Sequence, residues 1–544
     1  MPFTDRLGEI FLSQHEIVRK AAWIAASVTT AISIPAIALS NSIGEGGINA
    51  SRLHAPPYNL LGRKIAIGQV EIGRPAQFGI DKEIEPNHGT AVSGVFFRDR
   101  PAKIDTHVDG HAQNVAGVMV GNAKVTHGVA PEARLYASAA ASTFGMNRQV
   151  QECLATQHVA EQNSGDVRAI NFSFGEPLWL DPRPDAVLDG NALLTRCIDW
   201  SAQAHNILYV IAGNQGDGGI PIPTDNYNGI NVAFTRQVDG TFNQVDVANL
   251  GSVFTGVESR LVGLESNLDG RRSVSLVAPG RNVELLNLDG SISRDSGSSF
   301  AAPHAVGTVA LLQEYGDRQL QRQASRWSLD SRRHEVMKAV LLNAADKIQD
   351  RGNGLRQGMS RTVLDKDSKT WIDSDAYRDR QVPLHGDMGT GHLNAFRAYE
   401  QFRGGQWSPQ APVASIGWDY RSVETSDYRD YIIDAPLPAG SFVAATLAWN
   451  RNVELNDAND NNLYDAGETF RDGGLNDLNL YLMPADADET DQSVWSSVSE
   501  VDSVEHIFHR IPETGRYKLR VEYRNQANEP TQPFALAWWA VPQN

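Results

Sequence analysis

The chain has 544 residues, which is more than one ordinary domain holds and indicates two to four domains. Hydrophobic residues make up 41% and charged residues 21%, which is typical of a globular chain and excludes global disorder. The 65 acidic residues outnumber the 48 basic ones, giving a formal net charge of −17, so the surface is poorly suited to nucleic acid. Two cysteines can form neither a disulfide framework nor a four-thiolate zinc site.

Residues 21–39 (AAWIAASVTTAISIPAIAL) form an uncharged apolar run directly after Arg19 and Lys20. With the small residues at 36–38, the run is typical of an export signal or a membrane anchor. An amphipathic or buried helix is the alternative, since acidic residues precede the run. We therefore expect residues 1–44 to be an N-terminal segment of a secreted, cell-envelope or membrane-associated protein, with a cytoplasmic location as the alternative.

Short apolar, β-rich runs alternate with helical patterns between residues 60 and 310. Strands that are apolar on both faces and are separated by helices predict an α/β fold, with a parallel sheet covered by helices on both sides. Ligand-binding and catalytic groups should then collect at the carboxyl ends of the strands. The predicted strands are 64–70, 134–138, 167–174, 207–212, 230–234 and 273–277, and the predicted helices include 150–162 and 193–204.

The pattern changes after residue 402. Residues 404–412 form a polar linker containing Gly and Pro, and short alternating strands without a convincing long helix follow it. We therefore expect a separate small all-β sandwich over residues 405–544. Residues 351–385 are rich in Asp, Arg and Gly and are interpreted as an insertion near the end of the first domain. The predicted sandwich strands are 442–449, 478–482, 517–523 and 534–539.

The most specific motif is residues 296–304 (SGSSFAAPH), where a glycine-bearing turn opens an apolar helix. A serine in the first turn of a helix lies near backbone N–H groups that can bind an oxyanion. A proline is tolerated there because the first turn lacks intrahelical N–H partners. The string resembles the nucleophile motif of the subtilisin-like serine peptidases (subtilases), Gly-Thr-Ser-x-Ala-x-Pro-His. Alignment on Pro303 and His304 puts the nucleophile at Ser299, with Ser298 in place of threonine.

A serine hydroxyl needs a general base, and the candidate is His111 in residues 109–117 (DGHAQNVAG). This segment resembles the subtilase helix start His-Gly-Thr-His-Val-Ala-Gly, with departures at 112–114. The orienting acid implied by the resemblance is Glu71, which stands where the family pattern Val-x-Val-Ile-Asp-x-Gly has aspartate. The order acid, histidine, serine is that of subtilisin. The alternative is that Glu71 is a surface carboxylate and that another acid orients the histidine.

Two further segments resemble parts of the subtilase site. Residues 209–216 (YVIAGNQG) resemble the Ala-Gly-Asn-x-Gly loop, which implies that the amide of Asn214 and the Ser299 N–H form an oxyanion hole. Residues 169–175 (AINFSFG) resemble the Ile-Asn-x-Ser-x-Gly strand, which in the family pairs with the substrate backbone. The substrate-binding residues that this implies are Ser173, Phe174 and Gly175.

The resemblance covers residues 45–402 at several motifs in the family's order. It implies a serine endopeptidase that acts on protein or peptide substrates and needs no cofactor for its chemistry. We expect the protein to be a monomer. Residues 405–544 resemble the pre-peptidase C-terminal type of sandwich. The alternative is a catalytically inactive subtilase-fold protein that binds peptides, because Glu71, residues 112–114 and Ser298 depart from the family pattern.

An acidic stretch lies within the predicted sandwich, where residues 456–489 hold nine acids and one base. Residues 457–468 fit the twelve-residue EF-hand loop, and Asn462 replaces the usual glycine at its sixth position. Asparagine also tolerates the left-handed conformation needed there. We therefore expect a structural Ca²⁺ loop without flanking helices, with a solvated acidic loop as the alternative. The predicted ligands are Asp457, Asn459, Asn461, Leu463 through its carbonyl, Asp465 and Glu468.

Cys153 and Cys197 fall on predicted helices that can pack on the same face of the sheet. Two buried thiols are the favoured interpretation and a disulfide is the alternative, because spacing alone does not determine the geometry. Neither cysteine is expected to act as a nucleophile beside the serine motif.

Overall fold

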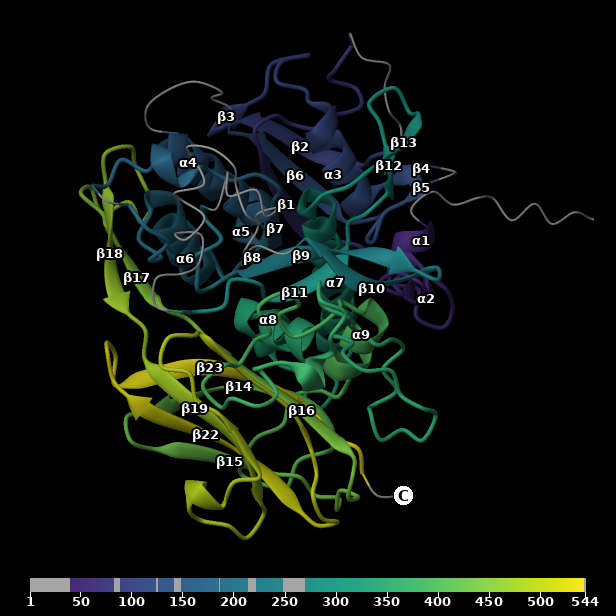
Figure 1. Cartoon of the computed structure of the whole chain (residues 1–544). Helices are drawn as coiled ribbons and strands as arrows, with labels where there is room; N and C mark the ends of the chain where they lie inside the picture. The colour runs from purple at the N-terminus through teal and green to yellow at the C-terminus, as the bar shows by residue number, and fades with distance from the viewer. Residues whose placement is uncertain are drawn as a thin grey trace, which may run out of the picture. The chain divides into compact units, whose positions relative to one another are not determined.

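The computed structural model describes residues 40–82, 89–123, 126–140, 148–184, 186–213, 222–247 and 270–542 (Figure 1). The apolar run at 21–39 and Asn214 lie outside these described residues. Within the described ranges, none of the helices has both the length and the apolar character needed to cross a membrane.

A mixed β-sheet forms the centre of the first part of the chain. Within the described residues it has nine strands, in the order β10-β9-β8-β7-β1-β6-β2-β3, with β11 also paired to β9. The central strands run parallel, whereas β10 and β3 pair antiparallel with their neighbours. The strands are β1 (Ala66–Glu71), β2 (Val92–Phe97), β3 (Arg100–Pro101), β6 (Arg134–Ala139), β7 (Val167–Phe172), β8 (Leu208–Ala212), β9 (Ile230–Val238), β10 (Thr241–Val247) and β11 (Leu276–Pro279).

Helices cover both faces of this sheet. Along β1, Ile67 lies in one hydrophobic core with helices α3 and α7, whereas Ala66 and Val70 lie in another core with α4 and α6. Because both faces are buried, the central strands are apolar at nearly every position, which confirms the predicted α/β fold. The helices are α1 (Ser40–Ile43), α2 (Ser51–His54), α3 (Gly110–Val120), α4 (Arg148–Ala160), α5 (Gln162–Gly165), α6 (Leu193–His205), α7 (Ser298–Gln321), α8 (His334–Asn343) and α9 (Ala395–Arg403).

The predicted strands coincide with observed ones to within a few residues, with one instructive difference. The strand predicted at 167–174 ends at Phe172, because the chain leaves the sheet there and Ser173 hydrogen-bonds to Ser299 instead. Small antiparallel pairs complete this part of the chain. They are β4 (Asn122–Ala123) with β5 (Thr126–His127), and β12 (Val283–Leu286) with β13 (Ile292–Asp295).

Cys153 of α4 and Cys197 of α6 form a disulfide, with their Cα atoms 5.9 Å apart. The favoured prediction of two free thiols is therefore wrong. The two helices pack against each other on one face of the sheet, and this contact brings the two Cα atoms into bonding range. Sequence spacing does not contain that information.

Two four-stranded antiparallel sheets follow the mixed sheet, in the orders β14-β23-β16-β21 and β15-β22-β19-β20. They enclose a core that contains Tyr431, Trp449 and Trp538. Antiparallel β-structure after residue 405 was predicted, and the structure confirms it. The strands are β14 (Ile416–Glu424), β15 (Tyr428–Ile432), β16 (Phe442–Trp449), β19 (Asp477–Pro484), β20 (Trp495–Ser497), β21 (Val504–Arg510), β22 (Tyr517–Asn525) and β23 (Thr531–Trp539).

The first of these antiparallel sheets packs against helix α8. Trp418, Ala448 and Ala535 of this sheet belong to the same hydrophobic cluster as the core beneath α3 and α7. The hydrophobic core therefore continues from the parallel sheet into the C-terminal region.

A two-stranded ribbon reaches from the C-terminal sheets to helices α4 and α6 (Figure 1). It consists of β17 (Asn452–Asn456), the connecting loop 457–468, and β18 (Thr469–Gly474). Val453 and Phe470 of the ribbon pack with the disulfide and with Trp200 of α6. We refer to residues 452–474 as the ribbon.

Candidate active site

Glu71 is the last residue of β1, and its side chain is only 3% exposed. β1 lies in the middle of the sheet between β6 and β7. Its carboxyl end therefore opens at the edge where parallel sheets place their functional groups. Glu71 is thus a buried carboxylate and not a surface one.

His111 lies in the first turn of α3, directly opposite Glu71. Asp109 caps this helix by accepting a hydrogen bond from the Ala112 N–H at 2.9 Å, which fixes the direction of the first turn. The Nδ1 atom of His111 is 3.4 Å from Oε2 of Glu71. The histidine side chain is 41% exposed while the acid is buried, so the imidazole connects the protein interior to solvent.

Glu71 and His111 shift each other's pKa. Burial lowers the pKa of His111, but the charge and hydrogen bond of Glu71, with Asp109 and Asp295, outweigh it and raise this pKa to about 9. Burial raises the pKa of Glu71, and the neighbouring His111 offsets part of that rise. The arrangement therefore stabilises an imidazolium, as the orienting acid of a catalytic triad must.

Ser299 is the second residue of α7 and is 8% exposed. Its Oγ donates a hydrogen bond to the Ser173 carbonyl at 3.2 Å, and Ser173 Oγ donates to the Ser299 carbonyl at 2.9 Å. The ring of the next residue, Phe300, has its centroid 5.7 Å from that of His111. The starts of α3 and α7 therefore meet, and the single hydroxyl proton of Ser299 points to Ser173 in this structure.

The predicted oxyanion donor Asn214 lies outside the described residues. The residue before it, Gly213, is described and follows β8 directly. Its N–H donates to the Val232 carbonyl at 2.9 Å, and its carbonyl accepts a hydrogen bond from Ser298 Oγ. Gly213 therefore lies beside the nucleophile motif.

The predicted substrate segment, Ser173 to Gly175, continues from β7 toward the start of α7. The Phe174 side chain is 7% exposed and stacks on Phe172 in the core beneath α4 and α6. The Phe174 side chain is therefore too buried to contact a ligand. A role of this segment in binding peptides therefore falls to its main chain.

Glu176 follows this segment and is a site feature that sequence reasoning missed. It is 1% exposed, its carboxylate is 2.7 Å from Arg148 Nη2, and its N–H and carbonyl both hydrogen-bond to Ile222. Burial and the proximity of Glu176 raise the pKa of Glu152 well above its usual range. The sequence signal that could have singled out Glu176 is an acid directly after the motif at 169–175.

Asp109 and Asp295, which help to raise the pKa of His111, were also missed. Asp109 carries a recognisable signal, because it stands at the N-cap position of a predicted helix. Asp295 ends β13, and only the fold brings it near the histidine.

The predicted calcium ligands all lie in the loop between β17 and β18. Asn459 and Asn461 both donate from Nδ2 to Asp465 Oδ2 at 2.8 Å, and Glu468 accepts hydrogen bonds from two N–H groups of the same loop. Asn462 has φ 60°, the left-handed conformation expected of the sixth position. Throughout the described residues, no three His, Cys, Asp or Glu side chains are grouped to hold a metal, so a site here needs amide and carbonyl oxygens in addition to carboxylates.

A model of the subtilase family matches residues 76–360. That match spans more than half of the chain, and it runs through His111 and Ser299. The chain belongs to the subtilase family. The match begins five residues after Glu71, so the candidate acid lies outside the matched range.

Relatives of this subtilase are serine proteases of low identity. It is 26% identical to a subtilisin of Bacillus sp. (strain TA39) over 214 residues, which cover 38% of this chain and 46% of that protein. It is 24% identical to thermitase of Thermoactinomyces vulgaris over 286 residues, which cover 51% and 84% of the two chains. The chain thus spans about half the length of the subtilisin it matches. Family membership and these relatives support a serine peptidase.

Among solved structures, the prenylagaramide maturation protease PagA aligns with a TM-score of 0.40 and 20% identity. The alignment covers 62% of this chain and 93% of PagA. At that score the alignment carries no inference about this chain.

Proposed function

We propose that this subtilase is a serine endopeptidase with Glu71, His111 and Ser299 as its triad. The observation that carries the proposal is the buried Glu71 carboxylate 3.4 Å from His111 Nδ1, beside the helix that begins with the nucleophile motif. A carboxylate in this position selects the imidazole tautomer that leaves Nε2 able to accept a proton, and it stabilises the charge that then forms.

In the proposed reaction, Ser299 Oγ attacks the scissile carbonyl carbon while His111 accepts the hydroxyl proton. The imidazolium then protonates the leaving amine, and a water molecule repeats the sequence to release the acyl group. The N–H of Ser299, in the first turn of α7, and the amide of Asn214 stabilise the oxyanion. No cofactor takes part in these steps.

Substrate binding supplies a reason for Ser299 to turn toward His111. In this structure the hydroxyl donates to the Ser173 carbonyl. An extended peptide that pairs with the segment from Ser173 to Gly175 competes for main-chain groups there. Rotation about χ1 of Ser299 then redirects the hydroxyl to the base, as catalytic hydrogen bonds often tighten only in the complex.

The hydrogen bond from Ser299 to Ser173 also favours the alternative, an inactive peptide-binding protein. A fluorophosphonate probe separates the two, because it reacts only with an activated serine. The endopeptidase proposal expects labelling of the wild type and none of Ser299→Ala. An unlabelled wild type that still binds peptides would establish the alternative.

The raised pKa of His111 predicts an alkaline activity profile. Only the neutral imidazole can accept the serine proton, so kcat/KM should rise with pH through a midpoint near the histidine pKa of about 9. In Glu71→Gln the midpoint should fall toward the ordinary histidine value, because the main cause of the rise is removed. The measurement is kcat/KM for a neutral peptide from pH 5 to 11, and an unchanged midpoint in Glu71→Gln would contradict the assignment.

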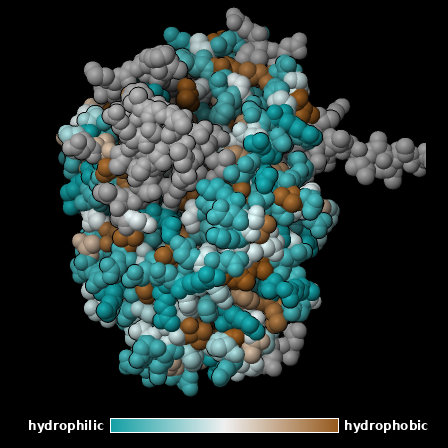
Figure 2. Space-filling model, viewed as in Figure 1, coloured by the Kyte–Doolittle hydropathy of each residue, from teal (hydrophilic) through white to brown (hydrophobic). Residues whose placement is uncertain are grey.

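We also propose that this peptidase works outside the cytoplasm, secreted or at the cell envelope, as a monomer acting on protein or peptide substrates. The disulfide between Cys153 and Cys197 supports an oxidising compartment. The net charge of −17 argues against nucleic acid as a partner. Figure 2 shows that hydrophilic residues cover most of the described surface on the face it draws. Residues 21–39 stay a candidate signal or anchor.

Loop 457–468 is proposed to bind a structural calcium ion. The fit rests on the closeness of Asn459 and Asn461 to Asp465 and on the left-handed conformation of Asn462. The two amides now donate from Nδ2 to Asp465, so each would turn over to present its oxygen to the ion. The loop also contacts the peptidase part, where Gln157 of α4 accepts from the Tyr464 N–H at 2.6 Å and donates to its carbonyl at 3.2 Å. Calcium would order the carboxylates and tighten this contact.

Calcium should raise the thermal unfolding midpoint of the full chain by several degrees over a chelated sample. The double variant Asp457→Ala/Glu468→Ala should lose most of that shift. Asp486→Ala, an exposed acid outside the loop, serves as the matched control and should keep the shift. Equal shifts in the double variant and the control would remove the site.

A further inference from the structure

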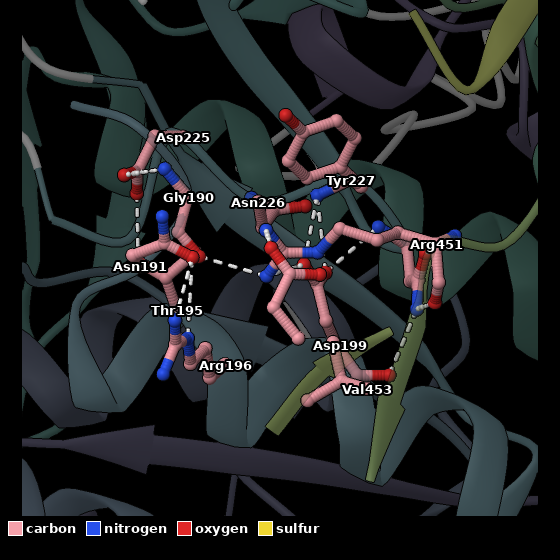
Figure 3. A network of polar contacts seen from close by, with 12 residues as sticks. Gly190, Asn191, Thr195, Arg196, Asp199, Asp225, Asn226, Tyr227, Arg451 and Val453 are labelled. Carbon is pink, nitrogen blue, oxygen red and sulfur yellow. Dashed lines mark hydrogen bonds and ion pairs between the residues drawn. The ribbon is translucent and has the colours of Figure 1, made fainter. Parts of the chain in front are cut away.

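Here the peptidase part means residues 45–402 and the C-terminal region residues 405–544. Arg451 lies between β16 and the ribbon, and its side chain reaches Asp199 in the peptidase part (Figure 3). The side chain is 2% exposed, and its Nη2 is 3.0 Å from Oδ2 of the fully buried Asp199 on α6. The same nitrogen donates to the Gly190 carbonyl at 2.7 Å. A residue of the C-terminal region thus neutralises a buried charge of the peptidase.

Asp199 and Arg451 together hold the segment 222–229. Asp199 accepts hydrogen bonds from the N–H groups of Tyr227 and Asn228 at 3.0 and 2.8 Å. Asn228 in turn accepts from the Arg451 N–H at 2.8 Å and donates to its carbonyl at 3.0 Å. The main chain and the side chain of Arg451 therefore both contact the turn at Tyr227 and Asn228.

The ring and the carbonyl of Tyr227 make further contacts with both parts of the chain. Two guanidinium groups lie close to its ring, with Arg271 3.5 Å and Arg451 4.5 Å from the ring centroid. Its carbonyl accepts hydrogen bonds from Lys338 Nζ and from Ser503 Oγ, each at 2.6 Å. Ser503, like Arg451, belongs to the C-terminal region. The turn is therefore enclosed between the two parts of the chain.

Ile222, the first residue of segment 222–229, connects this segment to the substrate segment through backbone hydrogen bonds. Ile222 pairs with Glu176 through two backbone hydrogen bonds of 2.8 and 3.0 Å. Glu176 immediately follows Gly175 in the chain. Displacement of the turn would therefore be passed to the main chain of Ser173 to Gly175, where a peptide is proposed to pair.

We propose that Arg451 is a positioning residue for the peptidase site, through which the C-terminal region sets the place of the substrate segment. The proposal deepens the proposed endopeptidase function and rests on it. A buried ion pair is a suitable device, because removing one partner leaves an uncompensated charge that must rearrange its surroundings. The C-terminal region is then part of the machinery that binds substrate.

The test compares Arg451→Met and Arg451→Lys with Arg471→Met in the full chain. Arg471 is an exposed ribbon residue paired with Glu454, so its loss should change little. We expect Arg451→Met to raise KM for an extended peptide about tenfold, with kcat per labelled serine changed less than threefold, because only substrate positioning is lost. Arg451→Lys keeps the charge opposite Asp199, so its KM should lie between those of the wild type and Arg451→Met.

A merely structural role would instead lower the fraction of chains that the fluorophosphonate labels and leave KM unchanged, and that result would overturn the proposal. An unchanged KM with full labelling would overturn it as well. If Arg451→Met does not fold, Asp199→Asn/Arg451→Met takes its place. It leaves no uncompensated charge, so a smaller KM rise is expected, from the lost contacts of Arg451 with Gly190 and Tyr227. If the wild type is not labelled, the endopeptidase proposal fails separately, and the peptide Kd of the same variants decides the role of Arg451.

Discussion

Ser299→Ala is expected to lower kcat for peptide hydrolysis by about 10⁶-fold, the order of loss seen when the nucleophile of a catalytic triad is removed. The fold should be unaffected, because the Ser299 hydroxyl makes one hydrogen bond of 3.2 Å, to the Ser173 carbonyl. The measurement is steady-state hydrolysis of an extended peptide by purified protein, with thermal unfolding of the same samples as a check of folding.

The matched control for that variant is Ser296→Ala, three residues earlier in the same turn. Its hydroxyl accepts a hydrogen bond from the Asn282 N–H at 2.9 Å and has no part in the proposed chemistry. It should keep kcat within about threefold of the wild type, as neutral surface substitutions do. Retained activity in Ser299→Ala would refute the proposed nucleophile.

Glu71→Gln is expected to lower kcat by about 10⁴-fold with little change in KM, since the orienting acid acts on the transition state and not on substrate binding. The amide keeps the shape of the side chain but removes the charge that raises the pKa of His111. Glu71→Asp keeps the charge and withdraws the carboxylate by about 1.5 Å, the length of one C–C bond, so intermediate activity is expected. Exposed Glu132, which pairs with Arg63, supplies the control variant Glu132→Gln.

Members of a triad act as a unit, so the kcat of the double variant Glu71→Gln/Ser299→Ala should be no lower than that of Ser299→Ala alone. Additive losses would mean that Glu71 works apart from the nucleophile. Turnover like that of the wild type in Glu71→Gln would show that another acid, such as Asp109, orients the histidine.

The two parts of the chain are more closely joined than their contrasting sequence patterns suggest. Trp418 and Ala448 share a hydrophobic cluster with the core of the parallel sheet, Arg451 pairs with Asp199, and Tyr464 is held by Gln157. The proposed calcium loop lies on the same ribbon that packs against α4 and α6. Experiments on calcium and on Arg451 therefore belong in the full chain.

The sequence by itself determined the α/β fold and its central strands, and it singled out two candidate site residues, His111 and Ser299. Apolar runs near Ala66 and Val167 became central strands because burial on both faces requires apolar residues at nearly every position. His111 and Ser299 were singled out because each lies in the first turn of a helix within a motif, and a helix start is a local feature of a few residues. The left-handed conformation at Asn462 was predicted for the same local reason.

Only the tertiary structure decided which distant groups meet. It buried Glu71 beside His111, joined Cys153 to Cys197, and inserted Arg451 opposite Asp199. Each of these contacts joins side chains on separate elements, and their spacing along the chain says nothing of their distance in space. Such contacts depend on how helices and sheets pack, and packing is decided by the summed complementarity of many side chains and not by any single motif.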